Sequence, residues 1–150
     1  MQVKDRSFLI TGGSSGLGAA CATSLVANGN RVMIADVNCE AAEQLIGEGG
    51  SKIAFKQTDV RNATEMQSAI EASLDIHGPL HGLITCAGIL RGARIIGRDT
   101  PHDLELFREI IDVNLVGTFN AMRLAAEAMV RTEPDQEGER GVIITTSSIA

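Results

Sequence analysis

The chain has 150 residues, of which 44% are hydrophobic, and this size and composition indicate one globular domain rather than a disordered segment. Its formal net charge of −6 argues against nucleic acid or an anionic membrane surface as the main partner. No stretch approaches the ~18 apolar residues of a membrane span, so we expect neither a membrane segment nor a secretory leader.

Apolar runs alternate along the chain with segments of helical periodicity, which is the pattern of repeated β–α units on a parallel sheet. The first expected strand covers residues 7–11, and a glycine-rich turn at 12–18 leads into a helix that closes near 28–30. A second strand is expected over 31–36, and a short helix over 39–47 is expected to end at its final glycine. The apolar positions of the first helix are Leu17, Ala20, Cys21 and Leu25.

The next β–α unit is expected to begin with a third strand over residues 52–59. Asn62 followed by Glu65 resembles a capping box, which predicts that a helix starts there. One face of that helix carries Met66, Ile70 and Leu74. The fourth strand and its exit turn occupy 81–88, and residues 89–99 form a longer loop with three arginines, expected to be solvated.

The sequence Thr-Pro-His-Asp at 100–103 predicts a helix start with Thr100 as the N-cap and Pro101 in the first helical position. A long helix is expected to follow, bent near Gly117. We interpret its apolar stripe as core whose outer part also joins a subunit contact. That stripe consists of Leu104, Phe107, Ile111, Leu115, Phe119, Met122 and Met129.

The last segments are a polar loop over 131–141 and a fifth strand over 142–144, which we expect to be buried. The whole pattern predicts an α/β fold, namely a Rossmann-type doubly wound parallel sheet with helices on both faces.

Three cysteines, Cys21, Cys39 and Cys86, are widely spaced, odd in number and without a metal-binding spacing. We therefore expect reduced thiols, no metal site and a cytoplasmic location. Cys86 is interpreted as a small hydrophobic residue rather than a nucleophile, because no base is placed to activate it.

The most informative stretch is Thr-Gly-Gly-Ser-Ser-Gly-Leu-Gly, where the first strand turns into a helix. Gly12, Gly16 and Gly18 let the backbone approach a pyrophosphate, which the positive end of the helix then attracts. Asp36 follows about 20 residues later, where a carboxylate binds the adenosine ribose and repels a 2′-phosphate. Because Ser15 rather than a basic residue precedes Gly16, and no Arg or Lys immediately follows Asp36, we predict NAD rather than NADP. A mere tight turn with a solvated acid is the alternative.

The T-G-x-x-x-G-x-G frame of these glycines resembles the short-chain dehydrogenase/reductase family, and the resemblance runs over essentially the whole chain. The spacing differs from the G-x-x-G-x-x-G of extended sugar-nucleotide epimerases. The resemblance implies that the turn binds NAD through Gly12, Ser15, Gly16, Leu17 and Gly18. It implies further contacts with the adenosine, from Asp59 and Val60 in T-D-V and from Cys86, Ala87 and Gly88 in C-A-G.

Two segments resemble those that carry the catalytic residues of the family. Residues 112–120 resemble the helix with the active-site Asn, here Asn114, whose backbone anchors a water in a proton relay. A buried amide that satisfies backbone groups is the other interpretation of Asn114. The final strand resembles the one carrying the catalytic Ser, aligned on Ser148, which would hydrogen-bond the substrate oxygen. Ser147 is the alternative.

The acid/base of the family is a Tyr activated by a Lys in a Y-x-x-x-K pair. The chain has no Tyr, and its three Lys stand at 4, 52 and 56. We therefore expect the pair to lie beyond Ala150, in a longer enzyme, and the chain itself to be inactive. In this interpretation residues 1–150 are an NAD-binding Rossmann domain that lacks its C-terminal strands, helices and substrate-pocket segment.

Within the family, C-A-G-I, the loop after the fourth strand and E-P-D-Q-E-G-E-R-G-V-I-I resemble type 2 3-hydroxyacyl-CoA dehydrogenases. This implies an NAD-dependent oxidoreductase that converts a small-molecule secondary alcohol or ketone and forms a homodimer or homotetramer. A 3-oxoacyl-type reductase is the rival enzyme. A non-catalytic dinucleotide-binding fragment is the alternative from another class.

Overall fold

Five parallel strands form a single sheet in the computed structural model, which describes residues 3–98 and 100–147. The strand order is β3-β2-β1-β4-β5, which is the order of a Rossmann-type sheet. The strands are β1 (Ser7–Thr11), β2 (Arg31–Asp36), β3 (Ile53–Gln57), β4 (Gly82–Thr85) and β5 (Val142–Thr145). The predicted α/β fold is confirmed.

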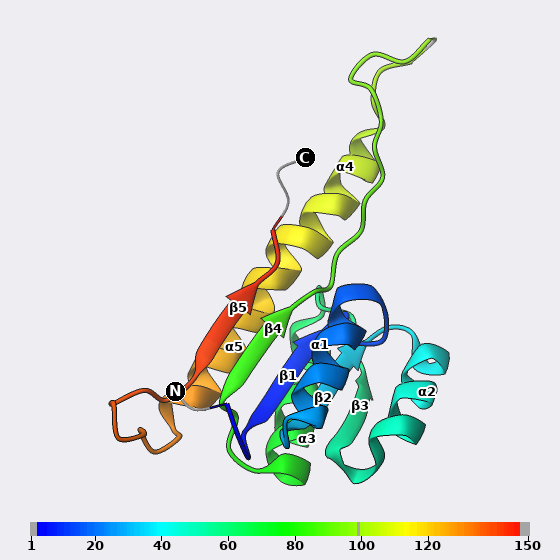
Figure 1. Cartoon of the computed structure of the whole chain (residues 1–150). Helices are drawn as coiled ribbons and strands as arrows, with labels where there is room; N and C mark the ends of the chain where they lie inside the picture. The colour runs from blue at the N-terminus through cyan, green and yellow to red at the C-terminus, as the bar shows by residue number, and fades with distance from the viewer. Residues whose placement is uncertain (1–2, 99, 148–150) are drawn as a thin grey trace.

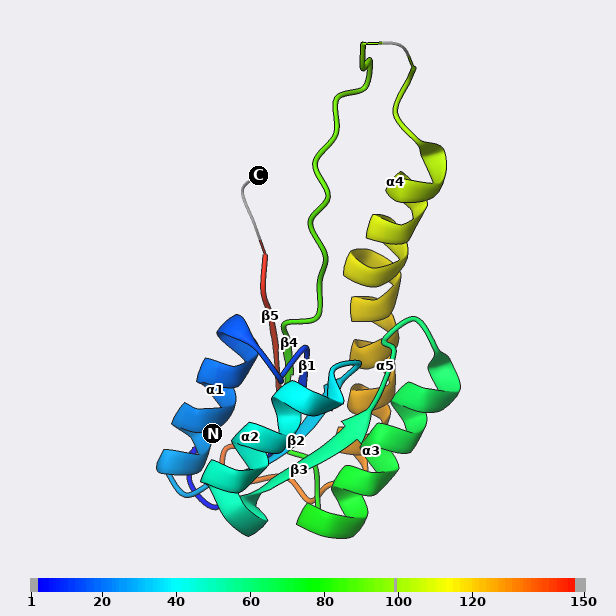
Figure 2. The same ribbon diagram turned by 90° about the vertical axis from the view of Figure 1, so that its right-hand side faces the viewer.

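Helices cover both faces of this sheet (Figures 1 and 2). The edge-on view of Figure 2 shows α1 and α2 on one face and α3 and α5 on the other. The helical segments are α1 (Gly16–Ala27), α2 (Cys39–Gly49), a 3-10 turn η1 (Gly50–Lys52), α3 (Ala63–His77), α4 (Leu104–Ile111), a π-helical segment η2 (Asp112–Gly117) and α5 (Thr118–Val130). Among the described residues, no helix is both long and apolar enough to cross a membrane.

The two faces of the central strand β1 supply two hydrophobic cores. Leu9 belongs to the cluster that α3 and α5 cover, whereas Ile10 belongs to the cluster against α1 and α2. Neighbouring residues alternate between the faces because successive side chains of a strand point in opposite directions. All five residues of β1 are buried, since β2 and β4 pair with it on either side. The first β–α turn is therefore held by the most buried strand of the sheet.

The predicted start of α3 is confirmed. The Asn62 side-chain oxygen accepts hydrogen bonds from the backbone N–H groups of Thr64 (3.0 Å) and Glu65 (3.2 Å). The Glu65 carboxylate accepts from the backbone N–H of Asp59 at 2.7 Å and from the Asn62 side chain at 2.8 Å. The Glu65 carboxylate therefore bonds the backbone of Asp59, a residue that precedes the helix. This hydrogen bond ties the loop before α3 to the helix.

The predicted end of the second helix at Gly47 is wrong, because α2 continues to Gly49. Gly50 has a positive φ of 59° and donates its N–H to the carbonyl of Ile46, so this glycine ends the helix. Residues 50–52 then form a 3-10 turn. The third strand consequently begins at Ile53 rather than at residue 52.

The predicted start of the fourth helix is also wrong. Asp103 is the N-cap of α4, and its carboxylate accepts from the N–H of Glu105 at 2.9 Å. Pro101 instead forms an antiparallel bridge with Ile96, and Gly97 donates its N–H to the Thr100 carbonyl at 2.9 Å. The Thr-Pro pair therefore belongs to the return arm of a hairpin-like loop rather than to a helix.

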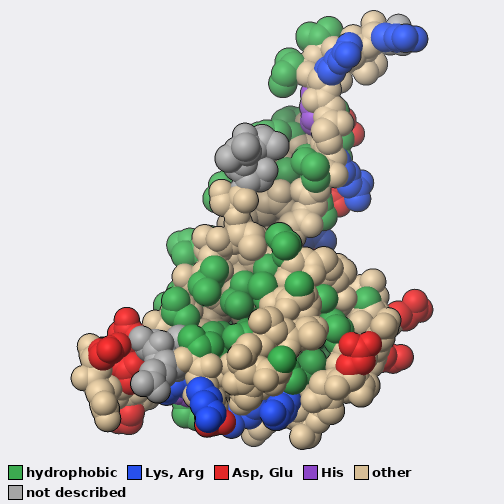
Figure 3. Space-filling view, viewed as in Figure 1, with side chains coloured by type: hydrophobic (Ala, Val, Ile, Leu, Met, Phe, Trp, Pro, Cys, Tyr) green, Lys and Arg blue, Asp and Glu red, His purple; other side chains and the backbone are tan. Residues whose placement is uncertain are grey.

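The expected long helix consists of α4, η2 and α5, and a π-helical segment ends at Gly117, the residue near which the bend was predicted. Its apolar stripe is core only in the C-terminal part, where Met129 is buried. Leu104, Phe107, Leu115 and Phe119 are between 53% and 63% exposed. The core interpretation is wrong for these four. Leu104 and Phe107 belong to α4, which projects beyond the sheet (Figure 1), and hydrophobic side chains reach the surface there (Figure 3).

The fifth strand is not buried as predicted. Val142 and Ile143 are partly buried, whereas Ile144 is 48% exposed. β5 pairs only with β4 and lies at the edge of the described sheet. On the face that carries α1 and α2, no helix of the described chain covers β5 (Figure 1).

Candidate binding site at the carboxyl ends of the strands

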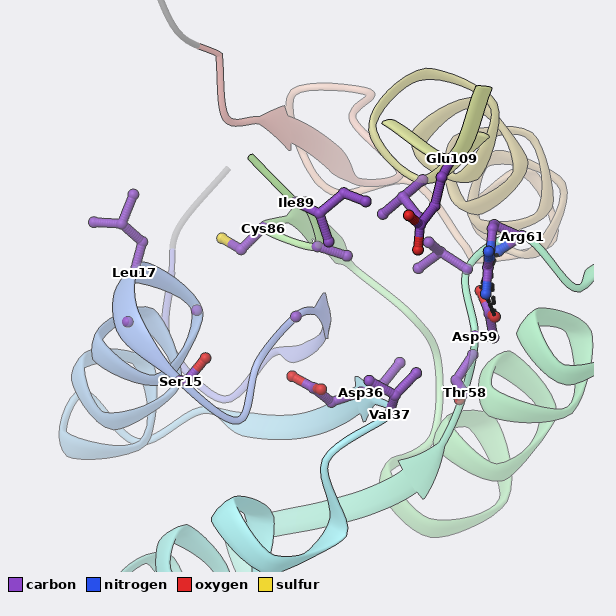
Figure 4. A pocket seen from close by; sticks show the side chains of 18 residues that line it. Ser15, Leu17, Asp36, Val37, Thr58, Asp59, Arg61, Cys86, Ile89 and Glu109 are labelled. Atoms are coloured by element: carbon purple, nitrogen blue, oxygen red, sulfur yellow. Dashed lines mark hydrogen bonds and ion pairs between the residues drawn. The ribbon is translucent and has the colours of Figure 1, made fainter. Parts of the chain in front are cut away.

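A cavity of about 420 Å³ opens at the carboxyl ends of β1, β2, β3 and β4. Figure 4 shows its walls converging from the β1–α1 turn, the ends of β2 and β3, and the segment after β4. The cavity is lined by all eleven residues predicted to bind the cofactor, namely Gly12, Ser15, Gly16, Leu17, Gly18, Asp36, Asp59, Val60, Cys86, Ala87 and Gly88. Open α/β sheets bind ligands at this place, where connections leave the central strands in opposite directions.

The β1–α1 turn has no room for side chains at two of its glycines. A Cβ on Gly12 would lie 2.5 Å from the backbone nitrogen of Ala87, and one on Gly18 would lie 2.1 Å from the carbonyl oxygen of Gly12. Gly12 also has a positive φ of 66°. The turn therefore packs backbone against backbone, and this brings the start of α1 to the cavity wall.

The N-terminus of α1 points its positive end at the cavity. Ser15 occupies the N-cap position but its side chain makes no capping hydrogen bond. Contrary to the expected apolar face of this helix, Leu17 is 71% exposed and Ala20 is exposed, whereas Gly18 and Ala22 are buried. The helix approaches the sheet through its small residues, which leaves Leu17 at the rim of the cavity.

Asp36 ends β2 with its carboxylate at the cavity. One carboxylate oxygen accepts the backbone N–H of Ser14 at 2.9 Å, and the other accepts the N–H of Asn38 at 3.0 Å. Each oxygen of an ionised carboxylate has two acceptor sites, so both keep one for a ligand. Asp36 thus joins the glycine-rich turn to β2 and presents a fixed negative charge beside it.

The loop after β3 is held at several points around Asp59. Asn120 of α5 donates its side-chain N–H to the Val60 carbonyl at 2.8 Å, while Glu65 binds the N–H of Asp59. The Arg61 guanidinium binds the Asp59 carboxylate, and this hydrogen bond holds the pKa of Asp59 below its usual value. Asp59 therefore stays ionised over a wider acid range than an isolated aspartate.

The segment after β4 forms the wall opposite the glycine-rich turn. Cys86 donates its backbone N–H to the Thr11 carbonyl at 2.9 Å, and its side chain packs against the core cluster under α1. Burial, with a smaller effect of the neighbouring Cys21 thiol, raises the pKa of the Cys86 thiol. A thiol held in its neutral form is a poor nucleophile.

Asn114 lies in η2 and bonds the backbone of one cavity residue twice. Its side-chain oxygen accepts the N–H of Ile89 at 2.8 Å, and its side-chain nitrogen donates to the Ile89 carbonyl at 2.9 Å. Asn114 is exposed, so the alternative interpretation as a buried amide is wrong about its burial. That interpretation is right that the amide bonds backbone groups. The water-relay role of Asn114 stays a prediction.

We expect Asn114→Ala to loosen the wall formed by the segment after β4, because both hydrogen bonds to Ile89 disappear. The Ile89 amide should lose protection from hydrogen exchange by about tenfold, the effect of roughly one lost hydrogen bond. Asn28→Ala is the matched control, since Asn28 bonds the carbonyl of Ser24 within α1, away from this wall. Unchanged exchange at Ile89 in Asn114→Ala would contradict the assignment.

Of the two serines that follow β5 in the sequence, the structure describes Ser147. Ser147 is exposed, and the preceding Thr146 is anchored through its hydroxyl to the Thr85 carbonyl at 2.8 Å. Ser148, the predicted catalytic serine, lies outside the described residues. Because β5 is parallel to β4, it ends at the same edge of the sheet as the cavity.

Sequence reasoning missed several residues of the cavity, namely Ala35, Val37, Thr58, Arg61, Ile89, Glu109 and Val113. Val37 and Thr58 adjoin predicted residues, so their position at a strand end was a usable signal. Glu109 and Val113 reach the cavity from α4 and η2 only through the packing of that helix, and no local pattern indicates this.

The strand order, the glycine-rich turn and the acidic end of β2 define a Rossmann-type fold with its crevice where the connections diverge. The chain belongs to the short chain dehydrogenase family, whose model matches residues 6–150. The family resemblance seen in the sequence is thereby confirmed.

The chain is 39% identical over 150 residues to a 3-hydroxyacyl-CoA dehydrogenase type-2 of Bos taurus, with 99% of this chain and 58% of that protein covered. The corresponding figures for the Drosophila melanogaster protein of the same name are 37%, 99% and 59%. A crystal structure of 3-hydroxyacyl-CoA dehydrogenase type-2 from Mycobacterium avium matches with a TM-score of 0.93 and 35% identity, covering all of this chain and 60% of that one. The chain thus spans less than two thirds of these relatives.

Proposed function

We propose that the chain is the NAD-binding part of a short-chain oxidoreductase that transfers a hydride between nicotinamide and a secondary alcohol or ketone. The observation that carries the proposal is the cavity where the strand connections diverge, which all eleven predicted cofactor residues line. Membership of the short chain dehydrogenase family supports the same reaction type. When bound, the nicotinamide supplies the hydride acceptor or donor.

The residues of this chain fit a dinucleotide. A side chain at Gly12 or Gly18 would collide with backbone, so the close approach that a pyrophosphate needs is built into the turn. In the proposal the start of α1 binds the pyrophosphate, and Asp36 accepts hydrogen bonds from the adenosine ribose. Asp59, Val60, Cys86, Ala87 and Gly88 surround the adenosine. The negative charge of Asp36 favours NAD over NADP.

The proposed substrate is a 3-hydroxyacyl-CoA or its 3-oxo form, a class that the names of the relatives from Bos taurus and Drosophila melanogaster support. In this proposal Asn114 and Ser148 belong to the catalytic group.

The chain contains no Tyr, so we propose that the acid/base lies in a further part of the enzyme and that residues 1–150 alone do not catalyse the reaction. The rivals are a 3-oxoacyl-type reductase and a non-catalytic dinucleotide-binding fragment.

For the quaternary structure we propose a homodimer or homotetramer that uses the exposed apolar stripe of α4 and η2. Burial of Leu104, Phe107 and Leu115 in a second subunit would explain side chains that the sheet does not cover. The three free cysteines suit a reducing compartment, and we propose the cytoplasm.

A fluorescence titration tests the proposal. The chain has neither Trp nor Tyr, so NADH fluorescence can be followed without a protein signal. We expect saturable NADH binding, weaker NADPH binding, and no oxidation of NADH by acetoacetyl-CoA with this chain alone. Absence of saturable binding would overturn the proposal, and turnover by the isolated chain would overturn the assignment of the acid/base to another segment.

A further inference from the structure

Arg61 surrounds the carboxylate of Asp59 with its own N–H groups. The backbone N–H of Arg61 donates to Oδ1 at 3.0 Å, Nε lies 3.0 Å from both oxygens, and Nη2 lies 2.6 Å from Oδ2. Such a fork fixes both the position and the plane of a carboxylate, which a single contact does not. Both residues line the cavity, and Figure 4 shows them together at one end of it, beside Glu109.

The number of donors leaves Asp59 one acceptor site to offer. An ionised carboxylate has about four lone-pair sites, and three N–H groups of Arg61 approach it, of which the Nε–H is shared between the two oxygens. The Asp59 side chain is 30% exposed, so the remaining site is accessible from the cavity. A carboxylate kept ionised offers no proton, and a ligand group that meets it must therefore be a donor.

The surroundings keep this pair in place from both sides. Glu65 binds the N–H of Asp59 at 2.7 Å, which fixes the backbone that carries the carboxylate. Arg61 is also attracted by the negative charges of Glu109 in α4 and Asp112 in η2. Glu109 in turn lies 3.6 Å from the guanidinium of Arg91. The guanidinium is thus held between Asp59 and the helical wall of the cavity.

We propose that Arg61 is a positioning residue that selects the base of the dinucleotide through Asp59. An acceptor-only carboxylate binds the exocyclic amino group of adenine, whereas it repels the carbonyl oxygen that hypoxanthine carries at the same position. The inference rests on the proposed function, because it requires that the adenosine occupies the end of the cavity next to Asp59. It assigns to Arg61 a role in specificity that goes beyond the contacts of Asp59 itself.

The test compares NADH with reduced nicotinamide hypoxanthine dinucleotide in fluorescence titrations of the whole chain. We expect the unaltered chain to bind NADH about tenfold more tightly, the effect of one hydrogen bond to a charged group. In Arg61→Gln the NADH affinity should fall about fivefold while the hypoxanthine dinucleotide changes less than about twofold. Arg61→Lys keeps the charge without the fork and should give an intermediate ratio.

Matched variants distinguish the positioning of Asp59 by Arg61 from a general effect of charge removal on dinucleotide affinity. Arg108→Gln removes the same charge from a pair with Glu105 on exposed α4 and should leave the ratio of the two affinities unchanged. Asp59→Asn should abolish the preference for NADH, and adding Arg61→Gln to it should change nothing further. If Arg61→Gln does not fold, as circular dichroism would show, Arg61→Lys provides the same comparison.

The outcomes are distinguishable. A ratio in a folded Arg61 variant equal to that of the unaltered chain would overturn the inference, because a merely structural Arg61 weakens both dinucleotides alike. Equal binding of both dinucleotides by the unaltered chain would also overturn it. If the unaltered chain binds neither dinucleotide, the proposed function fails first, and the role of Arg61 fails with it.

Discussion

Replacing Gly18 by alanine is expected to destabilise the chain by about 3 kcal/mol or more and to abolish NADH binding. The added Cβ would lie 2.1 Å from the carbonyl oxygen of Gly12 and 2.8 Å from the Cα of Gly13. Both are backbone atoms of the same tight turn, so no side-chain rotation relieves the overlap. α1 must move away from β1, and this displaces the helix N-terminus from the cavity wall.

Gly47→Ala is the matched control for this prediction. Gly47 lies in α2, and a Cβ built there meets nothing within 4 Å. The same added methyl should therefore stabilise the chain by roughly 0.5–1 kcal/mol, because alanine favours a helix over glycine. Urea unfolding of both variants checks the pair. Opposite signs are expected, and a Gly18→Ala variant as stable as the parent chain would refute the described packing of the turn.

The local parts of this fold are predictable from the sequence because buried parallel strands appear as continuous apolar runs. The strands β1 and β2 begin and end where the pattern places them. The glycine-rich turn and Asp36 were found for the same reason, since each follows directly on a strand. Their meeting in one cavity follows from the parallel sheet, whose carboxyl ends share an edge.

Other parts depend on neighbours that the local pattern does not contain. Thr100 and Pro101 look like a helix start, yet pairing of Pro101 with Ile96 makes them part of a loop. Leu104 and Phe107 have the spacing of a buried face, but α4 extends past the sheet that would bury them. Amphipathic spacing identifies an apolar face, whereas only the packing shows what covers it.

Arg61 is the clearest case of a residue whose position in the site no sequence pattern predicts. Its neighbour Asp59 was singled out through a family motif, and Arg61 follows as an ordinary surface residue of the same loop. Its role becomes visible only when three N–H groups are found on one carboxylate. Glu109 reaches the same cavity from a helix about fifty residues further on, because η2 and α5 pack against the loop at Val60 and Gly117.

Asp36→Asn is expected to remove most of the preference for NADH over NADPH. The substitution removes the negative charge that would face a 2′-phosphate. Like charges placed against each other in an interface cost several kcal/mol. NADH affinity should fall about tenfold, because a hydrogen bond to a charged acceptor becomes one to a neutral amide. NADPH affinity should rise or stay the same. Parallel fluorescence titrations with the two reduced dinucleotides measure both effects.

Two further variants show whether this effect belongs to the site. Asp75→Asn makes the same change of charge on the exposed side of α3 and should leave both affinities unchanged. Asp36→Ala should lose stability as well as the preference, because the N–H groups of Ser14 and Asn38 lose their acceptors. A preference for NADH that persists in Asp36→Asn would mean that another group repels the 2′-phosphate. The choice of cofactor would then have to be assigned to the other walls of the cavity.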